Sequence, residues 1–189
     1  GAKLYRRYRD AFSRSYQDRF LIQDAIDDLP ELERAIEEER LTLRVYPHLL
    51  HPDNRIKIKL YSPHIQLALS DVLPILENLG VRVISEIPFM IKPADYGDVV
   101  WIHDFELELP FELKDMAHFQ ESFAQTFLRI YGKNLENDPF NRLVTYAGLS
   151  WRQVTIMRAY AQYLRQLNLP FSKAYIASTL IKNPTLTAF

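Results

Sequence analysis

The chain has 189 residues, of which 48% are hydrophobic and 13% aromatic, enough apolar material to bury one sizeable core. Its 23 Lys and Arg residues nearly balance 24 Asp and Glu residues, so the net charge of −1 argues against nucleic acid or an anionic membrane as a partner. The sequence has no cysteine, which excludes disulfides, thiol catalysis and thiolate zinc sites. No apolar run approaches the roughly 20 residues that span a bilayer, and we expect a soluble protein.

The first 39 residues have the three-to-four spacing of apolar side chains that predicts helices. Tyr5, Tyr8, Phe12 and Tyr16 begin this pattern, which continues through leucines, alanine and isoleucine. Pro30 has no backbone N–H, so we expect it to separate or kink two helices.

After this helical segment the apolar period changes to two, as is typical of β-strands. We predict a hairpin in which "RLTLRVY" (40–46) and "RIKIKLY" (55–61) are the strands and "HPDN" lies in the turn. The second strand places its apolar side chains on one face and Arg55, Lys57 and Lys59 on the other. This pattern predicts a hairpin with one solvated face.

The following segments predict a helix over 69–79, strands over 81–91 and 98–109, and a helix from about residue 116 to 130. Strands joined through a helix are normally parallel, with room for a third strand between them. We therefore expect the 98–109 strand between 55–61 and 81–91, with 40–46 at the edge.

In this order Asp104, Glu106 and Glu108 lie beside the basic side chains of the hairpin on the solvated face, where each opposite-charge pair contributes about 0.2–1 kcal/mol. Both helices cover the apolar face. The predicted fold class is α+β, a ferredoxin-like plait with permuted ββαββα order, a four-stranded antiparallel or mixed sheet with helices on one face, and flanking helical N- and C-terminal segments.

The C-terminal part is predicted to be helical, with Ser150 and Gln153 forming a capping box at the start of its longest helix. We expect three segments: N-terminal helices over 1–39, an α/β plait over 40–134 and a C-terminal helical segment over 135–189. Because the chain begins with Gly rather than Met, and "IKNPTLTAF" leaves Leu186 and Phe189 to pack on something, we expect a segment of a longer protein.

Few residues suggest chemistry. The five glycines form no phosphate-binding loop. His103 falls on the core face of its strand, and a buried, hydrogen-bonded histidine is the better interpretation than a general base. His48, His51 and His64, with Asp53 as a fourth ligand, could bind zinc, but exposed turn histidines are favoured, so no metal site is predicted.

Arg152, Arg158 and Arg165 lie on a helix without acidic residues and could bind an anion, although a solvated or interdomain face is favoured.

The loop "YSPHIQLALSD" (61–71) is the most suggestive feature, because a helix N-terminus offers free N–H donors to a carboxylate. Ser70 and Asp71 compete as N-cap, and an Asp71 cap would put Pro74 at the third helical position. The predicted effector-binding residues are Ser70, Asp71 and His64, and a plain capped loop is the alternative. Gly80, at the other end of this helix, is interpreted as a packing device.

Several stretches together resemble the non-catalytic N-terminal portion of the large bacterial NAD-specific glutamate dehydrogenases, just upstream of the catalytic domain. They occur in the order "YRRYRDAF", "AIDDLPELE", "LSDVLPILENLGVRVISEIPF", "VWIHDFEL" and "FNRLVTYAGLSWRQVTIMRAYAQYLRQ". The resemblance extends from about Tyr5 to Ala188. It implies ACT-like regulatory modules in a cytoplasmic, homo-oligomeric parent enzyme that oxidatively deaminates L-glutamate to 2-oxoglutarate and ammonia with NAD.

The family's catalytic and glutamate-binding lysines and its dinucleotide fingerprint have no counterpart in this chain, so no catalytic residue is assigned and no cofactor is expected in the segment itself. "SPHIQLALSDVLP" also lacks the glycine that ligand-binding ACT domains place in this loop. The first hypothesis is an inactive regulatory or assembly module whose partners are the catalytic domain of the same chain and further copies of itself. The alternatives are an ACT-like sensor that binds a small amino-acid effector, or a free-standing interaction scaffold.

Overall fold

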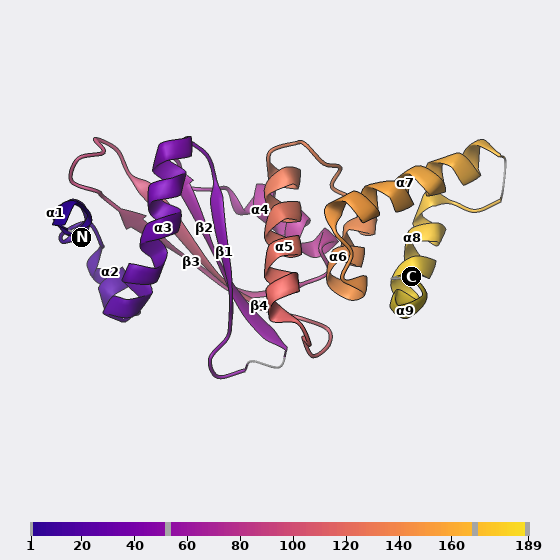
Figure 1. Cartoon of the computed structure of the whole chain (residues 1–189), viewed down its shortest axis with the longest axis horizontal. Helices are drawn as coiled ribbons and strands as arrows, with labels where there is room; N and C mark the ends of the chain where they lie inside the picture. The colour runs from indigo at the N-terminus through magenta and orange to yellow at the C-terminus, as the bar shows by residue number, and fades with distance from the viewer. Residues whose placement is uncertain (1, 52–53, 168–169, 188–189) are drawn as a thin grey trace.

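The computed structural model of the chain describes residues 2–51, 54–167 and 170–187. Figure 1 shows an elongated molecule in which the N-terminal helices and the C-terminal helices lie at opposite ends, with the sheet between them. The elements are α1 Ala2–Tyr8, α2 Arg14–Gln17, α3 Ile22–Glu38, β1 Thr42–Pro47, β2 Arg55–Pro63, α4 Leu69–Asn78, β3 Arg82–Ile91, β4 Val100–Glu108, α5 Met116–Tyr131, η1 Pro139–Asn141, α6 Arg142–Ala147, α7 Trp151–Gln166, α8 Lys173–Lys182 and α9 Pro184–Thr187.

The four strands form one sheet in the order β1-β2-β4-β3, and every neighbouring pair is antiparallel. Because β4 is antiparallel to both β2 and β3, the two strands that α4 connects run parallel to each other with β4 between them. This is the predicted strand order. It confirms the α+β class and the ferredoxin-like ββαββα plait.

The plait helices α4 and α5 cover one face of the sheet, as predicted, and form the main apolar core with it. Complete burial of an aliphatic or aromatic side chain stabilises the fold by about 1.5–3 kcal/mol. The central side chains of this core are Ile58, Leu60, Phe105, Leu107, Leu76, Phe123 and Phe127, all fully buried.

The opposite face is covered as well, so the prediction of a solvated face is wrong for the part of the sheet that the N-terminal helices cover. α3 packs across β1 and β2, and Tyr8 and Tyr16 join Ile102 of the sheet in a second apolar cluster. Lys59 and Asp104, which were expected in water, are only 1% and 2% exposed. Strand periodicity shows which side chains share a face, but it does not show whether a distant segment covers that face.

The ion pairs between β2 and β4 on this face join side chains that are diagonal neighbours rather than direct register partners. Lys57 Nζ lies 2.8 Å from Asp104 Oδ2, and Arg55 Nη1 lies 2.7 Å from Glu106 Oε1, whereas the direct register partners are Lys57 with Glu106 and Arg55 with Glu108. The predicted alternation of charge is therefore confirmed for Arg55 and Lys57.

Pro30 lies inside the continuous helix α3, so the prediction that it separates two helices is wrong. The breaks occur instead between α1 and α2 and between α2 and α3. Pro30 removes only the hydrogen bond to the carbonyl of Ile26, on a side of the helix where Ile26 is 52% exposed and water can reach the backbone.

The N-cap of α4 lies two residues before Ser70 and three before Asp71, the candidate caps. Ala68 is the N-cap and provides no side-chain hydrogen bond, while the Asp71 N–H donates to the Ala68 carbonyl. Ser70 and Asp71 therefore belong to the first turn, and neither caps the helix. Pro74 lies in the helix interior rather than at its third position.

The C-terminal helices extend beyond the plait, and α6 packs against α5 at the base of this extension. The predicted capping box is present, because the Ser150 hydroxyl accepts the Gln153 N–H while the Gln153 side chain accepts the Ser150 N–H. Of the two terminal side chains expected to pack, Leu186 is 75% exposed and Phe189 lies outside the described residues. No helix in the described part of the chain combines the length and apolarity needed to cross a membrane.

Candidate functional site

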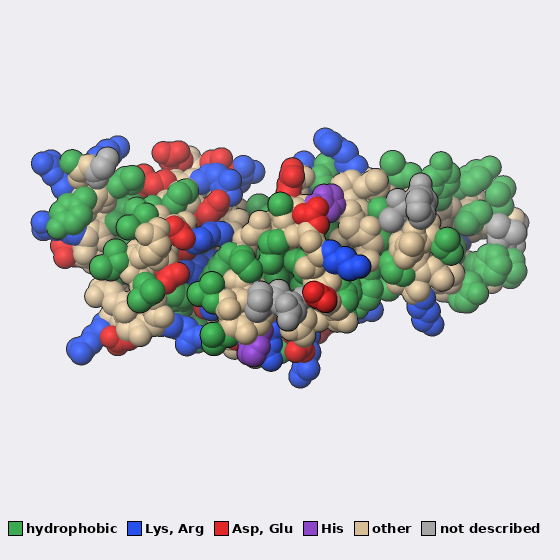
Figure 2. All heavy atoms as spheres, turned by 60° about the horizontal axis from the view of Figure 1, so that its bottom comes forward, with side chains coloured by type: hydrophobic (Ala, Val, Ile, Leu, Met, Phe, Trp, Pro, Cys, Tyr) green, Lys and Arg blue, Asp and Glu red, His purple; other side chains and the backbone are tan. Residues whose placement is uncertain are grey.

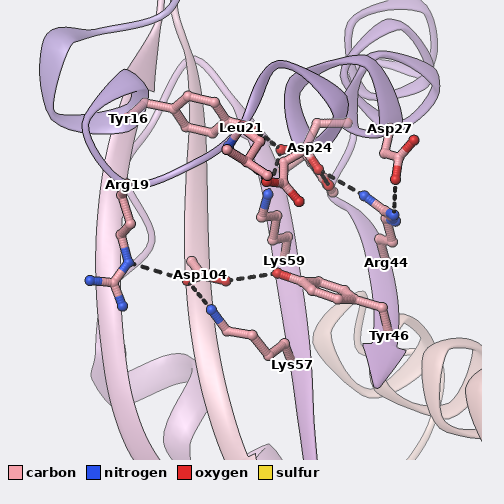
Figure 3. A network of polar contacts seen from close by, with 12 residues as sticks. Tyr16, Arg19, Leu21, Asp24, Asp27, Arg44, Tyr46, Lys57, Lys59 and Asp104 are labelled. Atoms are coloured by element: carbon pink, nitrogen blue, oxygen red, sulfur yellow. Dashed lines mark hydrogen bonds and ion pairs between the residues drawn. The ribbon is translucent and has the colours of Figure 1, made fainter. Parts of the chain in front are cut away.

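Asp28, in the middle of α3, is the centre of a buried network that joins this helix to the sheet. Its carboxylate accepts hydrogen bonds from the Tyr16 hydroxyl at 2.6 Å, the Tyr61 hydroxyl at 2.8 Å and Lys59 Nζ at 2.6 Å. Arg44 Nη1 adds a fourth donor at 3.1 Å. Figure 3 shows Tyr16, Lys59 and Arg44 converging from α2, β2 and β1. Charged donors replace the water that this buried carboxylate loses.

Asp104, on β4, is the second acid of the network. It lies 2.8 Å from Lys57 Nζ, accepts from the Tyr46 hydroxyl at 3.1 Å, and has Arg19 Nε at 4.0 Å (Figure 3). Burial, and then the nearby carboxylates, raise the pKa of Tyr16 and of Tyr46 above their ordinary values. Both hydroxyls therefore remain protonated and keep donating to the acids.

The network is a structural joint rather than a catalytic centre. A general base needs a free acceptor that faces substrate, but both oxygens of Asp28 already accept from protein donors, and the side chain is fully buried. Removing one partner of a buried ion pair typically destabilises a protein by about 3–5 kcal/mol. The Asp28 network can therefore hold α3 on the sheet in one orientation.

His64 forms a second, exposed joint between α3 and the plait. Its Nδ1 lies 2.7 Å from Asp98 Oδ2, its Nε2 contacts the Glu39 carboxylate, and the Tyr96 hydroxyl is 3.1 Å from Nε2. Hydrogen bonds to Glu39 and then to Asp98 raise the pKa of His64 above its usual value. His64 and Glu39 both adopt left-handed backbone, with φ of 67° and 48°, which is strained for residues other than glycine.

His103 is the buried, hydrogen-bonded histidine that the sequence predicted. It is 1% exposed; its Nε2 accepts the Leu67 N–H at 3.1 Å, so Nδ1 carries the proton and donates to Glu86 Oε1 at 2.7 Å. Burial lowers the pKa of His103, and Glu86 offsets part of that effect. His103 thereby anchors the loop that leads into α4.

The structure does not bring the three predicted effector-binding residues together. His64 faces Glu39 and Asp98, whereas Ser70 and Asp71 are exposed on the first turn of α4. Asp71 instead lies near the end of α5, where burial and then its charge raise the pKa of Tyr131. Effector binding at the 61–71 loop remains a prediction.

The histidines considered for zinc are also apart. The rings of His48 and His51 stack at 5.4 Å near one end of β2, and His64 follows its other end, roughly 30 Å away for nine residues of strand. Asp53 lies outside the described residues. Within the ranges that the structure describes, no group of three or more His, Asp or Glu side chains is placed to hold a metal ion.

Among the open grooves of the described surface, two lie beside the helices that flank the sheet, and neither of these is lined by Ser70, Asp71 or His64. One, of about 640 Å³, lies beside the α4–β3 joint, and the other, of about 400 Å³, lies between α2 and α3. Gly80, in the first groove, has φ of 81°, and a Cβ there would be 2.6 Å from Tyr146 Cε2. Its predicted role in packing is confirmed.

The three arginines of α7 have different surroundings. Arg158 is buried and makes a bidentate pair with Asp138, at 2.8 and 3.0 Å, with Asn141 as a further acceptor. Arg152 and Arg165 are exposed. Arg158 thus pairs with residues of its own C-terminal segment and ties α7 to the turn before it, so the interdomain interpretation does not apply to it, whereas Arg152 and Arg165 fit a solvated face.

Sequence reasoning missed Asp28 and placed Lys59 in water. The one available signal was the position of Lys59 in the middle of an apolar strand, since a lysine there needs a counter-charge if anything covers it. No local pattern identifies Asp28 as that counter-charge, because the two residues lie 31 positions apart.

Comparison with known families agrees with this arrangement. The model described as "Glutamate dehydrogenase, helical motif 2" matches residues 1–35, "ACT3 domain" matches 40–120 and "helical motif 3" matches 135–189. The chain is 38% identical over 185 residues to the NAD-specific glutamate dehydrogenase of Halomonas elongata, 40% over 181 to that of Pseudomonas aeruginosa and 32% over 183 to that of Mycobacterium tuberculosis.

These alignments include 97%, 95% and 94% of the chain, but the chain spans only 11% of each relative. The three matched regions correspond to the N-terminal helices, the plait and the C-terminal helices of the structure. The resemblance seen in the sequence is thus confirmed, and the chain belongs to the NAD-specific glutamate dehydrogenase family as a segment that contains the ACT3 domain and helical motifs 2 and 3.

Proposed function

We propose that this chain is a non-catalytic regulatory and assembly module of an NAD-dependent glutamate dehydrogenase. The parent reaction converts L-glutamate, NAD and water to 2-oxoglutarate, ammonia and NADH in the cytoplasm, and NAD binds elsewhere in the parent. The catalytic domain of the same chain and further copies of the module are the proposed partners. Residues 1–39, 40–134 and 135–189 act as its three structural segments.

The observation that carries this proposal is the buried network around Asp28. It pairs a buried acid with a buried lysine between a helical motif and the ACT-like sheet, with Asp28 and Lys59 at 0% and 1% exposure. Such a joint suits a regulatory or assembly module, because the N-terminal helices and the ACT-like sheet then move as one rigid body and keep a fixed relative orientation.

Measurements of turnover and oligomeric state on the isolated chain, the full-length parent and two variants of the parent test the proposal. The isolated chain should form no NADH from glutamate and NAD, whereas the full-length parent should turn over. In the parent, Asp28→Asn should alter oligomeric state or the response to effectors, while Asp27→Asn, the same change at an exposed neighbour, should not. Glutamate-dependent NADH formation by the isolated chain would contradict the proposal.

One observation favours the sensor alternative. The N-cap of α4 is Ala68, which has no side-chain acceptor, so the Leu69 and Ser70 N–H groups of the first turn have no side-chain cap and can meet a ligand carboxylate, while the Asp71 N–H already donates to the Ala68 carbonyl. Asp71 places a negative charge in the same turn and opposes such binding. Thermal unfolding with each common amino acid at millimolar concentration decides the question, and the absence of any stabilisation would exclude this alternative.

A further inference from the structure

The outer face of α7 carries a stripe of exposed apolar side chains. Ile156, Tyr160, Tyr163 and Leu167 are between 52% and 62% exposed, and spacings of four, three and four residues align them along one side of the helix. Ile156, Tyr160 and Tyr163 line a shallow apolar hollow of about 410 Å³ with Ala159. Figure 2 shows hydrophobic side chains gathered over the α7–α8 end of the molecule.

This stripe is separate from the side of α7 that the core uses. Val154, Arg158 and Ala161 are the buried residues of the helix, and they face the plait and α8. A long exposed apolar stripe on a folded domain marks an interaction surface. Its content of tyrosine and isoleucine, without Lys, Asp or Glu, matches the centre of protein interfaces.

The charges around the stripe indicate what kind of surface it meets. Residues 150–189 include five Lys or Arg and no Asp or Glu. Arg158 and Lys173 are neutralised by Glu136 and Asp138. The remaining cations, Arg152, Arg165 and Lys182, form no ion pair with any residue that the structure describes.

A second copy of the same face would bring these positive charges together, which disfavours symmetric self-pairing, whereas an acidic rim would be attracted. We propose that the α7–α8 end docks on an apolar surface with an acidic rim, which another segment of the parent polypeptide supplies. This rests on the proposed function, in which the module belongs to a longer enzyme. Tethering within one chain raises the effective concentration of the two surfaces, so that a contact too weak to hold separate molecules together can form.

Hydroxyl-radical labelling read by mass spectrometry tests the proposal at Tyr160 and Tyr163. Both tyrosines should be labelled readily in the isolated chain and several-fold less in the full-length parent enzyme. In the parent, Arg152→Glu together with Lys182→Glu should restore labelling, and so should Ile156→Asp. Arg40→Glu together with Arg82→Glu, a double charge reversal outside the α7–α8 end, should leave the protection intact.

Equal labelling of the two tyrosines in both proteins would overturn the proposal. Protection that survives both charge reversals would refute the acidic rim. Protection that appears in the isolated chain as its concentration rises would assign the surface to a second copy and equally refute the proposal. Glutamate-dependent NADH formation, measured on the same parent preparation, shows separately whether the proposed function holds.

Discussion

Lys59 Nζ lies 2.6 Å from Asp28 Oδ2, and the two residues are 1% and 0% exposed. The pair connects β2 to α3, and through α3 it joins helical motif 2 to the ACT3 sheet. Removing either partner of such an ion pair destabilises the fold, because the charge that remains is buried without a counter-charge and without water.

Asp28→Asn should therefore lower the free energy of unfolding by about 3–5 kcal/mol, and Lys59→Met by a similar amount. Because the two side chains share one interaction, the double variant should be much less destabilised than the sum. Urea denaturation measures the free energy of unfolding of the two single variants and the double variant. Asp27→Asn, at a neighbouring acid that is 40% exposed, is the control and should cost less than about 1 kcal/mol. Equal losses at Asp27 and Asp28 would argue against the network.

His64 should make the molecule more stable in mild acid. Since Glu39 and Asp98 raise its pKa in the folded state, the fold binds this proton more tightly than the unfolded chain does. The contribution is complete below the unfolded pKa of about 6.5 and is lost as pH rises through the folded pKa. His64→Gln should therefore destabilise the chain more at pH 6 than at pH 9 in thermal unfolding. An identical loss at both values would contradict the role given to Glu39 and Asp98.

His103 should act in the opposite direction. Burial lowers its pKa, so as pH falls the unfolded chain takes up this proton before the folded chain does. Stability is then lost progressively as pH drops below about 6.5 toward the folded pKa. His103→Gln can still accept the Leu67 N–H but does not titrate, and it should flatten the acid limb of the pH–stability curve. An acid limb as steep as that of the unsubstituted chain would contradict this role of His103.

Gly80 and Gly97 form a matched pair for separating backbone strain from crowding. Both have positive φ, 81° and 78°, but a Cβ at Gly80 meets Tyr146 at 2.6 Å, whereas nothing lies within 4 Å of one at Gly97. Gly97→Ala should cost only the strain of left-handed backbone, about 1 kcal/mol, and Gly80→Ala about 1–3 kcal/mol more. Chemical denaturation of the two variants tests the difference. An equal loss of unfolding free energy in both would show that the Tyr146 side chain moves aside without a measurable energetic penalty.

The sequence alone determined the strand order, the plait helices, the burial of His103 and the α7 capping box. Each depends on periodicity or on residues a few positions apart, where the geometry of a helix or strand dictates which side chains meet. The long motifs, in order, also sufficed to place the chain in its family.

Only the tertiary structure decided what lies over the charged face of the sheet. Lys57 lies on the face that alternation predicted, but Lys59, two residues on, is enclosed by α3, whose Asp28 lies 31 positions earlier in the sequence. Two further features became visible only in the structure: α4 has Ala68 as its N-cap, and α3 continues without a break through Pro30. Local propensity differences amount to about 1 kcal/mol or less for most residues and about 3 kcal/mol for a proline inside a helix. Packing between segments apart in the sequence outweighs them because it buries more surface and pairs buried charges.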